Sequence, residues 1–378
     1  MGLARLTVVS LPTNVLAVSH VIRHYPSMTQ RYVIIALVSA ALFGLSTPAA
    51  KLLLGSIDSA ILAGLLYCGA GAGVAVLRRV IRLAAPTGNV AEAPLSRADA
   101  PWLAGAIVAG GVVGPLLLMA GLSRTSAETA SLLLTLEGVA TALLAWFVFR
   151  ENFDRRIAIG MACLVAGALV LSWTGQPSWN GLLGPLAIAG ACLAWGLDNN
   201  LTKKVSLADP LQIVELKGLI AGPINLGLGF WAGASLPAFP SLAIAMLVGF
   251  LGYGVSLALF VRALRHLGAA RTGAYFATAP FIGALAALVL LHEPLTLQLL
   301  AAGALMAVGI WLHLTETHDH AHTHEPLEHE HLHTHDMHHQ HDHDPGDPMG
   351  ESHSHWHRHS PVTHSHPHVP DTHHPHRH

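Results

Sequence analysis

Ionisable side chains inside long apolar segments are the features of this sequence that could do chemistry. Glu137, which is followed by Gly138, lies ten residues into an apolar run that begins at Ala127. A charge near the centre of a membrane span costs about 2.5–3.5 kcal/mol on insertion scales, so it normally faces a cavity or a partner. We interpret Glu137 as a candidate carboxylate for binding a proton or a cation; the alternative is a structural carboxylate paired with another helix.

A second polar cluster, Asp198-Asn199-Asn200, follows Trp195-Gly196 in a later apolar run. Three consecutive polar side chains cannot all face lipid, because hydrocarbon leaves their hydrogen-bonding groups unsatisfied. We expect these three residues to line a central cavity. The alternative is a role at a cytoplasmic gate, because they lie only a few residues before Lys203. The full set of candidate cavity residues is Glu137, Gly138, Trp195, Asp198, Asn199, Asn200, Tyr275, Thr278 and Pro280.

Four more charged residues lie within or at the ends of apolar runs. Glu215 and Lys217 are two positions apart, which places them on different helix faces, so we expect each to reach a neighbouring helix or the interface rather than the other. Lys51 and Arg124 either attract an anionic group or lie at the lipid headgroups.

The C-terminal segment 315–378 has a different composition. Of the 28 histidines, 23 lie in residues 318–378, together with ten Asp/Glu and two Lys/Arg. With almost no large apolar residues, this tail is expected to be disordered. Its alternating His-x-His pattern with neighbouring carboxylates suits Zn²⁺, Ni²⁺, Co²⁺ or Cu²⁺. The candidate metal ligands are His318, His320, His322, His324, His329, His331, His333, His335, His353, His355, His357 and His359.

Several roles for the tail stay open: buffering metal, delivering it, sensing it, or none. Proton sensing is a further hypothesis, because an unperturbed histidine titrates near pH 6.5. Full protonation would change the formal charge of residues 318–378 from -8 to +15, which would draw the tail towards anionic lipid.

The overall composition excludes an ordinary soluble fold, because 52% of the residues are hydrophobic and only 11% are charged. A bilayer core about 30 Å thick needs a helix of roughly 20 apolar residues. Ten such runs are present, and the three cysteines lie inside apolar runs without a metal or disulfide spacing. The runs cover approximately 33–54, 59–77, 102–122, 127–149, 157–173, 182–201, 211–231, 242–261, 268–291 and 295–314.

The distribution of Lys and Arg predicts the orientation. Residues 1–317 carry a formal charge of +6, and with the N-terminus inside almost all of the cationic residues fall in cytoplasmic loops. We therefore expect a multi-pass protein of the inner or plasma membrane with both termini cytoplasmic. Residues 1–31 form an N-terminal segment that is not a convincing signal peptide, and Met28 is an alternative start.

The two halves of the apolar region resemble each other. The segment from Phe43-Gly44 to Lys51 matches that from Trp195-Gly196 to Lys203, and the segment from Ser126-Ala127 to Glu151 matches that from Gly268-Ala269 to Glu293. Residues 32–174 and 180–314 are thus predicted to be two units of five spans each. An odd number of spans inverts the second unit, and inverted repeats share a site that alternating access exposes to either side.

These duplicated motifs, together with 120–127 and 262–269, resemble the drug/metabolite transporter superfamily, in particular its ten-helix type with two EamA-like repeats. The resemblance implies an all-α secondary transporter that exports a small molecule such as an amino acid, metabolite or drug. Repeats of this family usually carry a proline about thirteen residues before the terminal Glu. Pro280 meets this before Glu293, whereas Gly138 stands at the matching position before Glu151.

The sequence therefore predicts a secondary transporter of a small organic solute with a metal-binding cytoplasmic tail, and coupling to protons is a further hypothesis. A divalent-metal (Ni/Co/Zn) efflux carrier is the alternative, disfavoured because no histidine lies in mid-span. A membrane-tethered metal sensor is a third class. No motif points to an enzyme, to a nucleic-acid partner or to a cofactor for transport; the partners expected are the substrate, the bilayer and metal ions at the tail.

Overall fold

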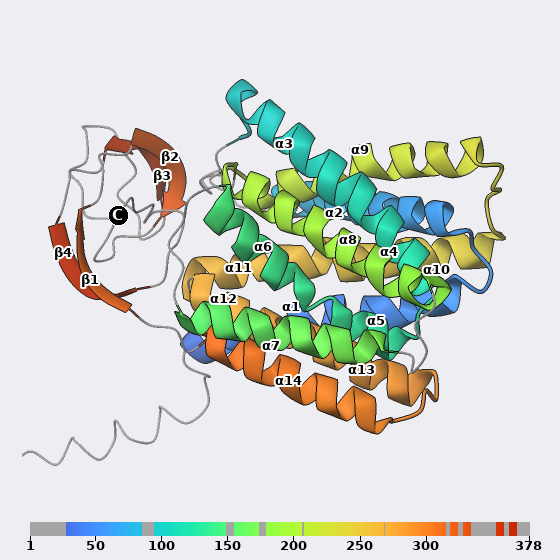
Figure 1. Cartoon of the computed structure of the whole chain (residues 1–378). Helices are drawn as coiled ribbons and strands as arrows, with labels where there is room; N and C mark the ends of the chain where they lie inside the picture. Colours follow the sequence, from blue (N-terminus) through green and yellow to red (C-terminus); the bar gives the residue numbers. More distant parts are fainter. Residues whose placement is uncertain are drawn as a thin grey trace, which may run out of the picture.

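A computed structural model describes residues 28–84, 94–148, 155–173, 179–205, 208–267, 269–314, 318–323, 328–333, 353–358 and 363–368. Up to residue 314 the described elements are all helical (Figure 1). Eight helices are long and apolar enough to cross a membrane, and two shorter apolar helices cover Ala279–Leu290 and Leu297–Leu312. The prediction of an all-α, multi-pass membrane protein is thereby confirmed, while the count of ten spans stays a prediction. The hypothesis about the N-terminal segment and the Met28 start concerns residues 1–27, which lie outside the described residues.

The described part of the first half contains five candidate membrane spans, which we call crossings. The first two are α1 (Met28–Leu53) and α2 (Ser59–Ala84). The third combines η1 (Arg97–Asp99), α3 (Ala100–Ala106), the π-helical segment η2 (Ile107–Val113) and α4 (Gly114–Leu122). The fourth combines α5 (Ala127–Leu133) and α6 (Leu136–Phe147), and the fifth is α7 (Arg155–Ser172).

The second half repeats this order of elements. It contains α8 (Trp179–Lys203), α9 (Pro210–Trp231), α10 (Phe239–Gly249), the π-helical segment η3 (Phe250–Val255), α11 (Ser256–Leu267), α12 (Ala269–Phe276), α13 (Ala279–Leu290) and α14 (Leu297–Leu314). A π segment interrupts the third crossing of each half, and a break divides the fourth. The duplication seen in the sequence is therefore also present in the helix order.

The breaks correct the sequence prediction, which expected continuous spans over 127–149 and 268–291. Thr135 ends the break between α5 and α6, and its hydroxyl donates to the carbonyl of Leu132 at 2.8 Å. Thr278 does the same between α12 and α13, donating to Tyr275 at 2.6 Å. Such local side-chain bonds compete with the helical ladder, so each crossing consists of two half-helices.

Small residues set the closest helix contacts. Gly71 of α2 meets Gly218 of α9 so tightly that a β-carbon on Gly71 would lie 2.5 Å from the amide nitrogen of Leu219. Gly222, one turn further along α9, packs against Cys68. Gly218 and Gly222, four residues apart on α9, thus let the two backbones approach closely, as small residues do in other membrane helices.

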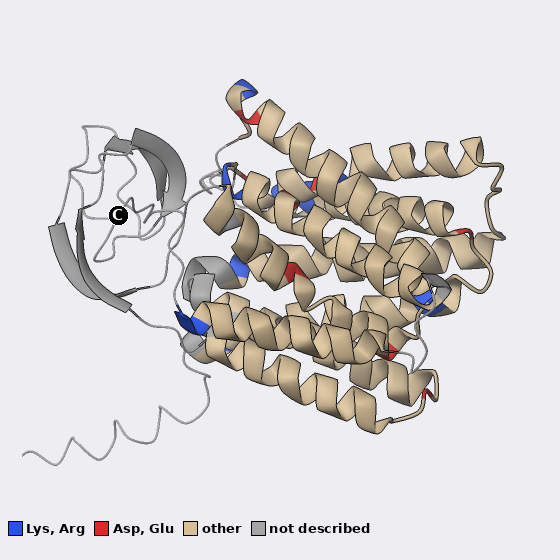
Figure 2. Ribbon diagram, viewed as in Figure 1, with Lys and Arg blue, Asp and Glu red and all other residues tan. Residues whose placement is uncertain are grey.

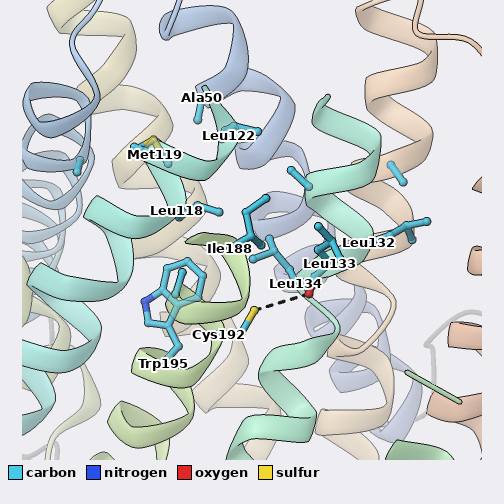
Figure 3. Close-up of a cluster of buried hydrophobic side chains, with 14 of the residues drawn as sticks. Ala50, Leu118, Met119, Leu122, Leu132, Leu133, Leu134, Ile188, Cys192 and Trp195 are labelled. Carbon is cyan, nitrogen blue, oxygen red and sulfur yellow. Dashed lines mark hydrogen bonds between the residues drawn. The ribbon is translucent and has the colours of Figure 1, made fainter. Parts of the chain in front are cut away.

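A buried apolar cluster joins α4, α5 and α8 (Figure 3). Leu118 and Leu122 of α4 and Leu133 of α5 surround Ile188 and Cys192 of α8, all with less than 2% exposure. The Cys192 thiol points at the carbonyl of Leu133, so this cysteine packs as a small buried hydrophobic residue. This cluster fixes the helices that carry the polar site described below.

The two lysines matched by the repeat lie at opposite ends of the bundle. Lys51 contacts Thr125, which lies against Gly184 near the start of α8. Lys203 is the last residue of α8, which is 25 residues long, or about 38 Å. We call these the Lys51 end and the Lys203 end. Figure 2 shows that Lys and Arg gather mainly at the end where α1 starts and α14 finishes, which is the Lys203 end.

The described residues of the tail form the short strands β1 (His318–Thr323), β2 (Glu328–His333), β3 (His353–Arg358) and β4 (Thr363–His368). β1 pairs with β4, and β2 with β3, both antiparallel. A two-stranded sheet by itself is marginally stable at best in water. The expectation that the tail is disordered therefore stays a prediction.

Candidate functional site

Glu137 lies in the first turn of the half-helix α6, one residue after its first residue, Leu136. The N-terminus of a helix carries partial positive charge, which favours a carboxylate there. Pro280 occupies the same place in α13, which begins at Ala279. By helix register, Glu137 and not Gly138 corresponds to Pro280. Half-helices that begin near the middle of the bilayer with their N-termini exposed to a polar site are typical of secondary transporters.

Asn199 of α8 is the partner of Glu137. Its amide donates to Glu137 Oε1 at 2.8 Å and lies 3.2 Å from the Thr141 hydroxyl. Asn199 and Gly138 are exposed, Glu137 is half-buried, and a β-carbon on Gly138 would meet nothing within 4 Å. This side of α6 is thus not covered by other described residues, and among them no Lys or Arg forms an ion pair with Glu137.

Asn200 points to another side of α8 and is buried. Its amide donates to the carbonyl of Gly196 at 2.8 Å and to the carbonyl of Thr141 at 3.1 Å. Gly196 in turn packs against Ala140 of α6. Asn200 therefore holds α8 against α6, a positioning role that differs from the accessible position of Asn199.

Asp198 forms an ion pair with Lys217 of α9. The Lys217 Nζ lies 2.5 Å from Oδ1 and 2.7 Å from Oδ2, and the Thr202 hydroxyl donates to Oδ1 at 2.9 Å. The two charged side chains are only 10% and 12% exposed. The pair is a neutralised charge site inside the bundle, and it joins two consecutive crossings of the second half.

The π segment η2 brings the two halves together beside this pair. The carbonyl of Gly110 accepts from the Tyr67 hydroxyl at 2.6 Å and from the Trp195 indole at 2.9 Å. The carbonyl of Gly111 accepts from the buried Asn225 amide at 2.9 Å. π segments frequently occur at functional sites. Here η2 supplies the carbonyl acceptors that position Trp195 and Tyr67.

Arg78 of α2 joins the second half at the Lys203 end. Its guanidinium contacts Asp209 through Nε at 3.0 Å and Nη2 at 2.8 Å, and Glu215 through Nη1 at 2.9 Å. Glu215 and Lys217 thus reach different neighbouring helices, as their spacing predicted. The sequence did not indicate Arg78 as the partner.

The remaining candidates of the set lie apart from Glu137. The backbone carbonyl of Tyr275 and the hydroxyl of Thr278 form the break before α13, and Pro280 follows in its first turn. Among the described residues, no hydrogen bond joins these three to Glu137 or Asp198. They shape the broken helix rather than the polar cluster of α6, α8 and α9.

Lys51 binds backbone carbonyls, and its two predicted roles stay predictions. Its ammonium donates to the backbone carbonyls of Leu122 and Thr125, at 2.6 and 2.7 Å. The carbonyls at a helix C-terminus lack intrahelical partners, so they are ready acceptors for a cation. Arg124 is exposed and donates to the carbonyl of Ala120 at 3.0 Å.

The candidate metal ligands of the tail fall on β1 to β3 or outside the described residues, and the helices offer no alternative. Within the described residues, no group of three or more His, Cys, Asp or Glu side chains could hold a metal ion. Metal binding by the tail stays a prediction.

Sequence reasoning missed Lys217 as the partner of Asp198, and it missed Tyr67, Thr141 and Arg78. A lysine within an apolar run was the signal for Lys217. Thr141 is one turn after Glu137, a signal that helix periodicity could have provided. Tyr67 carried no signal, since an isolated tyrosine in an apolar run is ordinary.

A duplicated bundle with broken helices and a polar cluster in its interior defines the class of multi-pass membrane transporters. The chain belongs to the EamA-like transporter family, whose model matches residues 30–173 and 182–315. Its family is thus one of transporters, in agreement with the prediction that the protein is not an enzyme.

Two relatives are similar along much of the chain. An uncharacterized transporter of Methanothermobacter thermautotrophicus is 28% identical over 293 residues, which cover 74% of this chain and 84% of the relative. The uncharacterized transporter YvbV of Bacillus subtilis is 28% identical over 200 residues, covering 51% of this chain and 64% of the relative.

A solved crystal structure has the same fold. It aligns with a TM-score of 0.55 at 16% identity and covers 75% of this chain and 95% of its own. At this identity the likeness concerns the fold alone.

Proposed function

We propose that this transporter is a secondary carrier that exports a small organic solute by alternating access, with Glu137 as the group that binds the solute or the coupling proton. The single observation that carries the proposal is the charge balance inside the bundle. Asp198 is neutralised by Lys217, whereas the hydrogen-bond donor to the Glu137 carboxylate within the described part of the chain is the neutral amide of Asn199.

An unpaired carboxylate in an apolar bundle is costly, because burial removes its hydration. Glu137 therefore favours any state in which a proton or a cationic group neutralises it. Its accessible position beside Gly138 allows such a partner to arrive and leave. A group that is alternately neutralised and released is what a coupled carrier needs.

The direction of transport and the orientation belong to the same proposal. The concentration of Lys and Arg at the Lys203 end supports a cytoplasmic location for that end and for the tail. A divalent metal as the substrate finds less support, because the described helices offer no cluster of metal ligands.

The test is transport by purified protein in proteoliposomes with an imposed pH gradient. Full-length protein and a variant that ends at residue 314 are offered a panel of amino acids and metabolites and a panel of divalent metals. We expect accumulation of an organic solute that depends on the gradient and survives removal of the tail. Metal flux that survives tail removal but is lost in Glu137→Ala would favour the metal carrier instead.

Coupling is tested with Glu137→Gln, which keeps the shape and removes the charge. We expect it to lose accumulation driven by the pH gradient, while Asp58→Asn, at an exposed loop carboxylate, keeps it. Unchanged proton dependence in Glu137→Gln would eliminate the coupling role.

A further inference from the structure

Glu293, the terminal glutamate of the second half, caps a helix of the first half. Its Oε1 accepts the backbone amide of Ala127 at 2.9 Å, and its Oε2 accepts that of Glu128 at 3.0 Å. These are the first two amides of α5, which have no acceptor within the helix. The adjacent Ser126 does not cap them, because its hydroxyl donates to the Glu128 side chain.

The backbone before Glu293 is held in an uncommon conformation. His292 has a φ of 54°, a region that residues other than glycine rarely adopt. The chain leaves α13 through this residue, so the turn that follows aims the Glu293 carboxylate at α5. The contact is thus built by the connection between α13 and α14.

Lys51 holds the other side of the same turn. Its ammonium binds the carbonyls of Leu122, at the end of α4, and Thr125, two residues before Ala127. The cation therefore meets the carbonyl end of one helix and the carboxylate meets the amide end of the next, as the helix dipoles favour. Together, Glu293 and Lys51 fix the connection between α4 and α5 from two sides.

Below this connection, α5 and α13 are packed together. A β-carbon on Gly283 of α13 would lie 2.9 Å from the Ser131 hydroxyl of α5 and 2.7 Å from the carbonyl of Gly44 of α1. Ser131 is 1% exposed. At the Lys51 end the two halves are thus in direct contact.

The Lys203 end lacks the equivalent packing. There the corresponding half-helices are α6 and α12, and within the part of the chain that the structure describes they do not pack along each other. The contact between these paired half-helices is therefore present at the Lys51 end and, among the described residues, missing at the Lys203 end, where Arg78 and Asn200 still join the two halves.

The closed end also carries an electrostatic cost. Thr125 Oγ1, Glu128 Oε2 and Ser131 Oγ are buried and have no hydrogen-bond partner among the residues that the structure describes. Buried polar atoms without partners destabilise the state that contains them, and opening would return them to water. The capping bonds of Glu293 and Lys51 offset part of this cost in the closed state.

We propose that Glu293 and Lys51 form a latch that keeps the Lys51 end closed, and that its release lets α13 separate from α5. This inference rests on the proposed alternating access. It gives a role to two residues that the duplicated motifs marked and that the polar cluster does not use.

The test measures exposure of Ser131 without any substrate. Ser131→Cys is introduced after Cys68, Cys163 and Cys192 are replaced by alanine, and the full chain is treated with a membrane-impermeant maleimide in sealed vesicles of each orientation. Glu293→Gln and Lys51→Met should each raise the labelling rate from the Lys51 side by about tenfold, the effect of losing a hydrogen bond to a charged group.

Asp58→Asn is the matched control. Asp58 also lies at the Lys51 end and caps a helix N-terminus, accepting from Ala60 at 2.8 Å, but it does so within its own half. In the Asp58→Asn variant, the labelling rate of Ser131→Cys should equal that in the parent. Equal rates in the parent and both latch variants would overturn the proposal.

Folding is checked by size-exclusion profile and thermal unfolding. If both latch variants fail to assemble, the two residues are folding determinants and the latch is refuted. Failure of the proposed function is a different result, namely a parent protein that transports nothing, and the labelling assay is independent of it.

Discussion

Lys217 on α9 and Asp198 on α8 form an ion pair inside the bundle, with the Nζ within 2.7 Å of both carboxylate oxygens. Asp198 also lies against Gly110 of the first half, so closely that no β-carbon fits there. The pair is consequently a joint between both halves beside the proposed site. Substitution of either residue of the pair should therefore change the stability of the fold more than the substrate specificity.

Removing one partner of the pair should be strongly destabilising. Lys217→Met leaves Asp198 buried without a counterion, which we expect to cost about 3–5 kcal/mol in the free energy of unfolding. The double variant Asp198→Asn with Lys217→Met removes both charges and should recover a large part of that loss. Thermal unfolding in detergent measures both; a double variant less stable than the single one would contradict this account.

Arg78 should not be replaceable by lysine. Arg78→Ala leaves Asp209 and Glu215 near one another without their shared cation, and we expect a loss of about 2–3 kcal/mol, below that of a fully buried pair. Arg78→Lys should recover only part of the stability, because an ammonium cannot reproduce the three guanidinium contacts. The neighbouring exposed Arg79 provides the control, and Arg79→Ala should melt like the parent.

Two glycine-to-alanine changes should have opposite effects. In Gly110→Ala the new methyl group meets the Asp198 carboxylate, an overpacking that we expect to cost about 1–3 kcal/mol. In Gly227→Ala the methyl group of α9 meets nothing within 4 Å, and the change should stabilise the helix by up to about 1 kcal/mol. The unfolding temperatures of the two variants, each compared with that of the parent, test this prediction. Equal shifts would show that the close approach at Gly110 does not affect stability.

The tail should respond to pH. Protonation of its histidines changes the formal charge of residues 318–378 from -8 towards +15, so a peptide of residues 315–378 should bind anionic liposomes at pH 5.5 and not at pH 7.5. Neutral liposomes are the control and should bind it at neither pH. Association with anionic liposomes that is the same at both values would reject proton sensing by the tail.

The break in each fourth crossing is a feature that the hydrophobic pattern of the sequence does not predict. An apolar run of span length predicts a helix, and both runs are helical. The interruptions at Thr135 and Thr278 depend on hydroxyls that bond to the preceding turn, an option that threonine does not always take. For this reason the sequence placed Glu137 within a span but not in the first turn of a half-helix.

The sequence by itself determined the helical membrane character, the duplication, and which residues inside apolar runs are exceptional. These follow from local composition, since a span must be apolar over its whole length and a charge within it needs a partner. Only the tertiary structure decided which partners meet. Lys217 joins Asp198, Arg78 joins Asp209 and Glu215, and Glu293 caps α5 from the other half. Such contacts join residues far apart in the chain, and helix packing fixes them through close glycine approaches that no single segment encodes.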